Sequence, residues 1–155
     1  MAHGSDSSDH RLSKTELKER IQELRKRAMR IRSGQDSSIK GEGRITAELL
    51  SIERKIDMLV HRNIEGRRAL ASVLRRYEVT VRQGANPKTA IIKLLEPNRT
   101  YAAVSRRANV LAYADSEDMS ATALKQLLLR KGFTVIESRY RKKARDSDDS
   151  DRVSR

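Results

Sequence analysis

Apolar residues recur at alternating steps of four and three between Ile45 and Val73, and this spacing restricts the fold more than any other feature of the chain. Residues three and four apart share one face of an α-helix, whereas apolar residues of a half-buried strand stand two apart. The spacing therefore predicts a long helix from about residue 44 to residue 76. At two seam positions, Asn63 can fix the register of helix pairing and Gly66 favours a bend. Alternatively, the seam ends near Leu59 and the helix continues alone.

A second helix is predicted over residues 14–32, before the long one. Ser13 and Glu16 form a capping-box sequence at its start, and a polar stretch with three glycines, residues 33–43, follows it. That stretch is long enough to fold the two helices into an antiparallel hairpin. Seams of this kind favour a coiled coil that joins copies of the chain, so residues 13–76 are predicted to be an oligomerising helical hairpin. Its predicted contact residues are Leu17, Ile21, Leu24, Leu49, Ile52, Ile56 and Leu59.

The period changes at Tyr77, where apolar and polar residues alternate through Val81 as in a strand. Capping residues and prolines then delimit helices at 87–95, 99–114 and 121–131, and residues 133–138 read as a second strand. Two strands pairing beneath three helices give a small α+β domain, β-α-α-α-β, over residues 77–138. The predicted fold class is thus mainly α, with a helical hairpin followed by this small domain.

Acidic, serine-rich segments stand at both ends of the chain. Residues 1–12 are predicted to be a disordered acidic leader, and residues 139–155 a disordered tail that is basic and then acidic. Serines among the aspartates resemble substrates of an acid-directed kinase, and phosphates there would oppose the nearby bases. These serines are Ser5, Ser7, Ser8, Ser147 and Ser150.

The body of the chain is strongly basic: 34 Lys and Arg residues against 21 Asp and Glu residues give a net charge of +13. Such a surplus favours polyanionic partners, and arginine adds bidentate geometry toward phosphate. Tyr140, inside a basic run, is the best candidate for stacking on a base. The predicted nucleic-acid-binding residues are Arg25, Lys26, Arg27, Arg30, Arg32, Arg67, Arg68, Arg75, Arg76, Arg139, Tyr140, Arg141, Lys142, Lys143 and Arg145.

The sequence carries no recognisable enzyme signature. It has no cysteine and three histidines, which argues against a metal site, and it lacks nucleotide-binding glycine motifs and nucleophile motifs. Asp57 and His61, four apart on one helical face, are expected to be a surface pair. We therefore predict no catalytic residue, no metal and no cofactor. No apolar run is long enough to span a bilayer. A soluble intracellular protein is expected, with residues 139–145 resembling a nuclear localisation signal.

These features favour a non-enzymatic, oligomeric protein that binds nucleic acid, RNA rather than DNA, through backbone phosphates. By analogy of architecture, a viral accessory protein, such as a silencing suppressor or polymerase cofactor, would suit this plan. One alternative is a sequence-specific DNA regulator in which helices 87–95 and 99–114 form a helix-turn-helix that reads bases through Asn98, Arg99, Thr100 and Arg106. Another is a coiled-coil adaptor between proteins, with an acidic partner.

Overall fold

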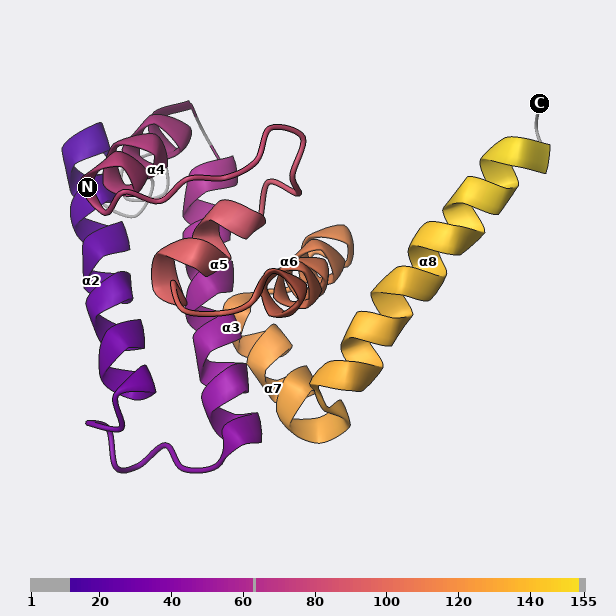
Figure 1. Cartoon of the computed structure of the whole chain (residues 1–155), viewed down its shortest axis with the longest axis horizontal. Coiled ribbons are helices and arrows are strands. Elements are labelled where there is room, and N and C mark those ends of the chain that lie inside the picture. Colours follow the sequence, from indigo (N-terminus) through magenta and orange to yellow (C-terminus); the bar gives the residue numbers. More distant parts are fainter. Residues whose placement is uncertain (1–11, 63, 154–155) are drawn as a thin grey trace, which may run out of the picture.

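The computed structural model describes residues 12–62 and 64–153, and every regular element in those residues is a helix (Figure 1). The predicted fold class is therefore wrong in its second half, since the described residues contain no strand and no β-α-α-α-β domain. The helices are α2 (Lys14–Arg32), α3 (Glu42–His61), α4 (Ile64–Arg76), α5 (Thr89–Leu95), α6 (Tyr101–Ser116), α7 (Ala121–Lys131) and α8 (Phe133–Val153).

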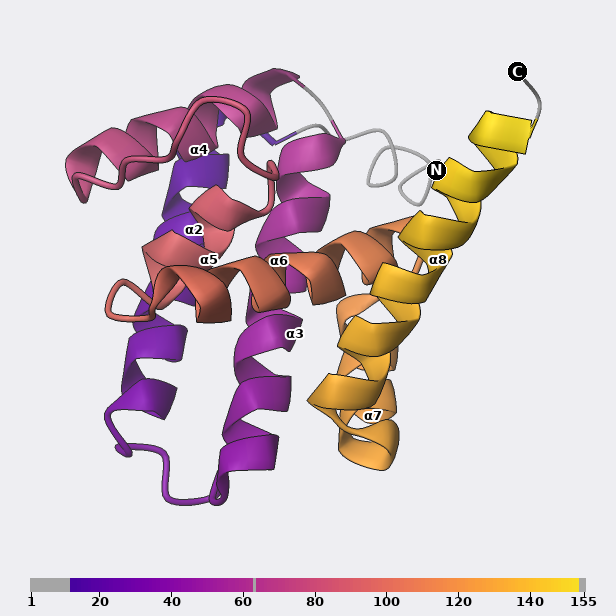
Figure 2. The ribbon, with the colours of Figure 1, turned by 45° about the vertical axis from the view of Figure 1, so that its right-hand side comes forward.

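The predicted hairpin is confirmed: α2 and α3 lie side by side and antiparallel, joined at one end by the polar connection (Figures 1 and 2). The capping box at the start of α2 is also confirmed, because the Ser13 hydroxyl accepts from the Glu16 backbone N–H and the Glu16 carboxylate accepts from the Ser13 N–H. α7 has its predicted bounds, with the Ser120 hydroxyl accepting from the Ala123 N–H.

α3 is the central helix, and it contributes to two hydrophobic cores. Leu49, Ile52 and Ile56 pack with α2, α4 and α5, whereas Ala47 and Leu50 pack with α6, α7 and α8. The two cores thus do not follow the predicted division at residue 76. The apolar seam in the sequence indicated only the face of α3 that packs in the first core, and not the face that packs in the second.

The long seam belongs to two helices rather than one. α3 ends at His61 and α4 begins at Ile64, so the chain turns just before Gly66 and α4 crosses the ends of α2 and α3 (Figure 2). Gly66 is buried against the last turn of α3: a Cβ there would stand 2.5 Å from the carbonyl oxygen of Leu59 and 2.9 Å from Cα of Val60. Because it has no side chain, Gly66 allows α3 and α4 to pack closely together. The predicted register role of Asn63 lies outside the described residues.

The first predicted strand is a turn followed by an extended connection. The N–H groups of Tyr77 and Val79 donate to the carbonyls of Val73 and Leu74, which ends α4 with Glu78 in the left-handed region at φ 55°. Tyr77 and Val79 pack against the first core, and Val81 is exposed. The alternation identified Tyr77 and Val79 as inward residues correctly but was wrong for Val81. A strand also needs a partner strand, and none forms in the described residues.

The second predicted strand is the start of α8. Gly132, at φ 91°, ends α7, and the next helix begins at Phe133. Ile136 and Glu137 are buried and Phe133 packs against the second core, a helical spacing that the pattern of Phe133 and Val135 concealed. The helix continues through Val153, so the prediction of a disordered segment from residue 139 fails as far as that residue. Residues 1–11 of the predicted leader lie outside the described residues.

A pair of carboxyl groups is buried between α3 and the end of α5. Glu96 accepts from Nε of Arg99 and Nε of Arg107 on its Oε1, while Glu53 receives no hydrogen bond from the described residues. Burial, followed by repulsion from Glu96, raises the pKa of Glu53 well above its ordinary value. A protonated Glu53 can donate to Glu96, so the neutral form suits this position.

Replacing Gly66 by alanine is expected to lower the free energy of unfolding by about 1–3 kcal/mol, because the added methyl group meets backbone atoms that cannot yield cheaply. The matched control is Gly43→Ala in α3, where a Cβ meets nothing within 4 Å and the helix gains about 0.5 kcal/mol. Urea unfolding measures both. Equal effects of the two substitutions would contradict the close-approach role of Gly66.

Replacing Glu53 by glutamine is expected to stabilise the chain by about 1–3 kcal/mol at pH 7, since the amide keeps a donor for Glu96 and carries no charge. The folded chain holds the Glu53 proton to higher pH than the unfolded chain does, so its stability falls as pH rises above 4.5 toward the raised pKa. The advantage of the variant should therefore grow between pH 4.5 and that pKa. Glu19→Gln, at an exposed site on α2, is the control. An advantage that shrinks as pH rises would refute this assignment.

Candidate nucleic-acid interface

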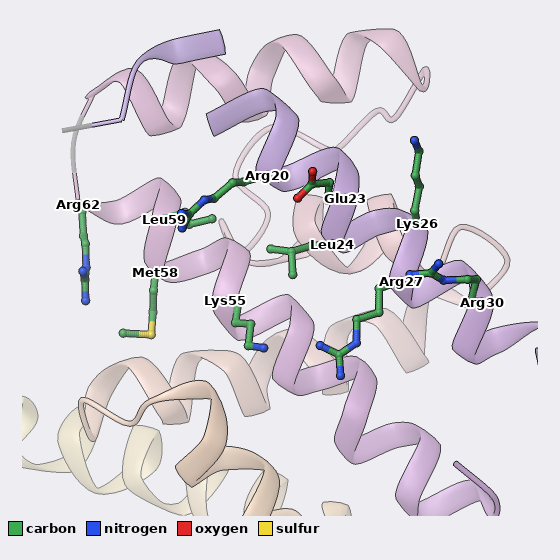
Figure 3. Close-up of a pocket in the computed structure, with 10 residues that line it drawn as sticks. All are labelled: Arg20, Glu23, Leu24, Lys26, Arg27, Arg30, Lys55, Met58, Leu59 and Arg62. Carbon is green, nitrogen blue, oxygen red and sulfur yellow. The ribbon is translucent and has the colours of Figure 1, made fainter. Parts of the chain in front are cut away.

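A groove of about 860 Å³ runs between the outer faces of α2 and α3 (Figure 3). Its lining combines six cationic side chains with one acid and three apolar side chains. Both helices supply cations, and the apolar side chains lie among them (Figure 3). The lining residues are Arg20, Glu23, Leu24, Lys26, Arg27 and Arg30 from α2, and Lys55, Met58, Leu59 and Arg62 from the end of α3.

The two helices present this groove because their buried seams face elsewhere. On α2, Arg20, Leu24, Arg27 and Arg30 follow each other at steps of four, three and three, which keeps them on one face. On α3, every residue from 47 to 60 is buried except Lys55, Met58 and Leu59, and all three line the groove. The groove is thus the one side of that stretch of α3 that other helices leave open.

Few cations of the groove form ion pairs with acids. Among the groove cations, within the described residues, only Arg27 forms an ion pair, and its NH2 lies 3.9 Å from Oε2 of Glu48. Glu48 is buried and also pairs with Lys125 of α7. Asp36 lies near Arg27 and Arg30: hydrogen bonds from Ser38, and then the charges of these two arginines, lower its pKa. Unpaired cations on a concave surface create a local positive potential, which attracts anions.

The structure divides the first predicted cluster. Lys26, Arg27 and Arg30 line the groove, but Arg25 stacks on the ring of Tyr77, with its guanidinium carbon 3.7 Å from the ring centroid. NH1 of Arg32 donates to the carbonyl of Leu95 at 3.0 Å. These two arginines therefore hold helices together. Arg20, Lys55 and Arg62 also line the groove and were not predicted, although the seven-residue spacings from 20 to 27 and from 55 to 62 match the period of the apolar seam.

The second predicted cluster lies on α4, where Arg67, Arg68, Arg75 and Arg76 are exposed. Arg68 pairs with Glu65 at 3.2 Å, and a pair exposed to solvent at this spacing contributes little stability. None of these four residues lines the groove. They form a separate basic surface.

The third predicted cluster lies on α8, on the far side of the molecule from α2 (Figures 1 and 2). Arg141 pairs with Glu137, and Lys143 pairs with Glu117 at 2.8 Å. Tyr140, the predicted stacking residue, is half-buried. The cations of this cluster that remain exposed and without a partner in the described residues are Arg139, Lys142 and Arg145.

The predicted contact residues of a coiled coil are used within the chain itself. Leu17, Ile21, Leu49, Ile52 and Ile56 are buried in the first core and are not available to a second chain in this fold. The other two predicted residues, Leu24 and Leu59, are half-buried in the groove. Of the seven predicted contact residues, only the two in the groove are therefore open to a second chain.

Asp57 is fully buried in an ion-pair cluster, which corrects the expectation of a surface pair with His61. Lys88 Nζ donates to Asp57 Oδ1 at 2.7 Å, NH1 of Arg54 donates to Asp57 Oδ2 at 2.8 Å, and His61 Nε2 lies 2.7 Å from Oδ1. Asp115 completes the cluster through Arg54 and Lys88. Partial burial acts to raise the pKa of Asp115, but Lys88 and Arg54 outweigh it and lower that pKa.

This cluster joins elements that are distant in the sequence. Lys88 occupies the space beside Asp57 and His61 and ties the chain before α5 to α3, while Arg54 also donates to the carbonyl of Met119. Each charged side chain of the cluster has an oppositely charged partner within it. Among the described residues no group of three or more His, Asp or Glu side chains is arranged to hold a metal ion.

Comparison of the chain with protein-family models, with characterised proteins and with solved structures gives no match. No helix in the described residues is long and apolar enough to cross a membrane.

The helix-turn-helix alternative finds its proposed reading residues already engaged. Arg99 binds Glu96 at 3.0 Å, and the Thr100 hydroxyl caps α6 by accepting from Ala103 N–H. Arg106 pairs with Glu137 at 3.4 Å, whereas Asn98 is exposed. This face thus offers fewer free cations than the groove does.

Proposed function

We propose that this chain is a non-enzymatic protein that binds nucleic acid, RNA in preference to DNA, in the groove between α2 and α3. The observation that carries the proposal is the set of six cations around one concave surface, only one of which has an acidic partner in the described residues. Phosphate backbones bind such surfaces by displacing condensed counterions. The net charge of +13 supports attraction of the same ligand over a longer range.

A protein–protein adaptor is the second candidate function, because an acidic amphipathic helix also presents anions beside apolar side chains. We favour nucleic acid because cations outnumber apolar side chains in the groove by six to three, and because other exposed cations, on α4 and α8, add to the positive charge of the whole molecule. An acidic peptide that binds the groove more tightly than RNA does would favour the adaptor instead.

Removing three groove cations, in the variant R20Q/R30Q/K55Q, is expected to weaken RNA binding by about ten-fold or more at 0.15 M salt. These three residues are exposed and have no ion-pair partner in the described residues, so the fold should persist; Arg27 is retained because it pairs with the buried Glu48. Fluorescence anisotropy with a labelled RNA measures the affinity, and circular dichroism checks helicity.

Two variants of equal charge change are the controls: R67Q/R75Q/R76Q on α4 and R139Q/K142Q/R145Q on α8. They should weaken binding less than the groove variant does, because they only reduce the overall potential. If all three variants lose the same affinity, bulk charge rather than the groove binds the RNA. If the unaltered protein shows no binding to RNA or DNA, the proposed function is wrong.

A further inference from the structure

We infer that the groove takes a single-stranded polynucleotide, with its bases against the apolar floor and its phosphates on the cationic rim; this inference rests on the proposed function. The floor is formed by Leu24, Met58 and Leu59, which are half-buried and so keep apolar atoms open to a ligand. Leu24 lies in the middle of the groove, with Arg20 and Arg62 toward one end and Lys26, Arg27 and Arg30 toward the other (Figure 3).

A duplex cannot use this floor. Its sugars and phosphates face outward, and its bases are paired and stacked inside, so only the cations of the rim would touch it. The volume of about 860 Å³ is also that of a ligand pocket rather than of a surface that follows a duplex. A single strand, in contrast, exposes the apolar face of each base beside a phosphate.

The chemistry of the floor predicts weak discrimination between bases. None of the ten lining residues is aromatic, so bases meet aliphatic carbon and the polarisable sulfur of Met58 rather than a stacking ring. Such contacts depend on the area of the base and not on its hydrogen-bonding groups. Apart from the cations, which face the phosphates in this arrangement, Glu23 is the only polar side chain among the ten lining residues, so few groups are left to distinguish one base from another.

The test compares a single-stranded RNA with an abasic oligomer that has the same number of phosphates, and with a duplex of the same sequence. The full chain should bind the RNA roughly ten-fold more tightly than the abasic oligomer, since each base adds apolar contact. The duplex should bind no more tightly per phosphate than the abasic oligomer. Single-stranded DNA of the same sequence should show the same gain over its abasic form, because the floor does not address the 2′-hydroxyl; a gain seen with RNA alone would contradict this assignment of the floor.

Met58→Gln tests the floor, because glutamine keeps the length of the side chain and its helix propensity but replaces apolar atoms by an amide. The ratio of RNA to abasic affinity should fall by at least half in this variant. The same exchange at Met29, which lies outside the groove on α2 beside Arg32, should leave the ratio unchanged.

The outcomes separate the two proposals. Equal affinity for the RNA and the abasic oligomer, or tighter binding of the duplex, overturns the single-strand inference and leaves phosphate binding in place. Binding of none of these oligomers overturns the proposed function and the inference with it. If the bases increase affinity but Met58→Gln does not reduce this increase, the bases bind elsewhere. That result overturns the assignment of the floor.

Discussion

The buried charges of α3 are the constraint on which the rest of the structure depends. Glu48, Arg54 and Asp57 lie in a helix whose residues from 47 to 60 are almost all buried, and a buried charge costs several kcal/mol unless a partner compensates it. Partners outside α3 come from different parts of the chain, so the surrounding helices must dock correctly around α3. These partners are Arg27 and Lys125 for Glu48, Asp115 and the Met119 carbonyl for Arg54, and Lys88 for Asp57.

The candidate site follows from the same packing. Six neighbouring helices pack against α3 and leave one strip open, formed by Lys55, Met58 and Leu59. α2 lies along that strip and adds its own outer face, which is rich in arginine. The groove is complete within one chain, because a hairpin that is held by its core presents both of its walls.

Sequence reasoning predicted those elements whose signals are local. The capping box at Ser13, the seam of α2 and the Ser120–Gly132 limits of α7 each depend on residues within a few positions, and all are confirmed. The strands failed because alternation at Tyr77 or Phe133 cannot show whether a partner strand exists. The double burial of α3 was hidden because its polar residues, such as Arg54 and Asp57, resemble a solvent-exposed face until their distant partners are known.

For the candidate site, composition predicted a polyanionic ligand but did not show which surface would bind it. Lys26, Arg27 and Arg30 were predicted and line the groove, while Arg25 and Arg32 carry the same charge and are used to hold Tyr77 and the end of α5. A linear cluster contains every face of a helix, and only three-dimensional packing decides which face remains exposed. Lys55 and Arg62 belong to none of the three basic clusters of the sequence and become part of the surface only because α3 lies beside α2.

The central claim is that cations of this groove bind nucleic-acid phosphates, and the dependence of affinity on salt tests it most directly. If all six groove cations contact phosphates of a single strand, a plot of log K against log salt concentration should fall with a slope approaching about −4, since each contact contributes about −0.7. A slope of about −2 or steeper agrees with the account. An affinity that does not change with salt would contradict it.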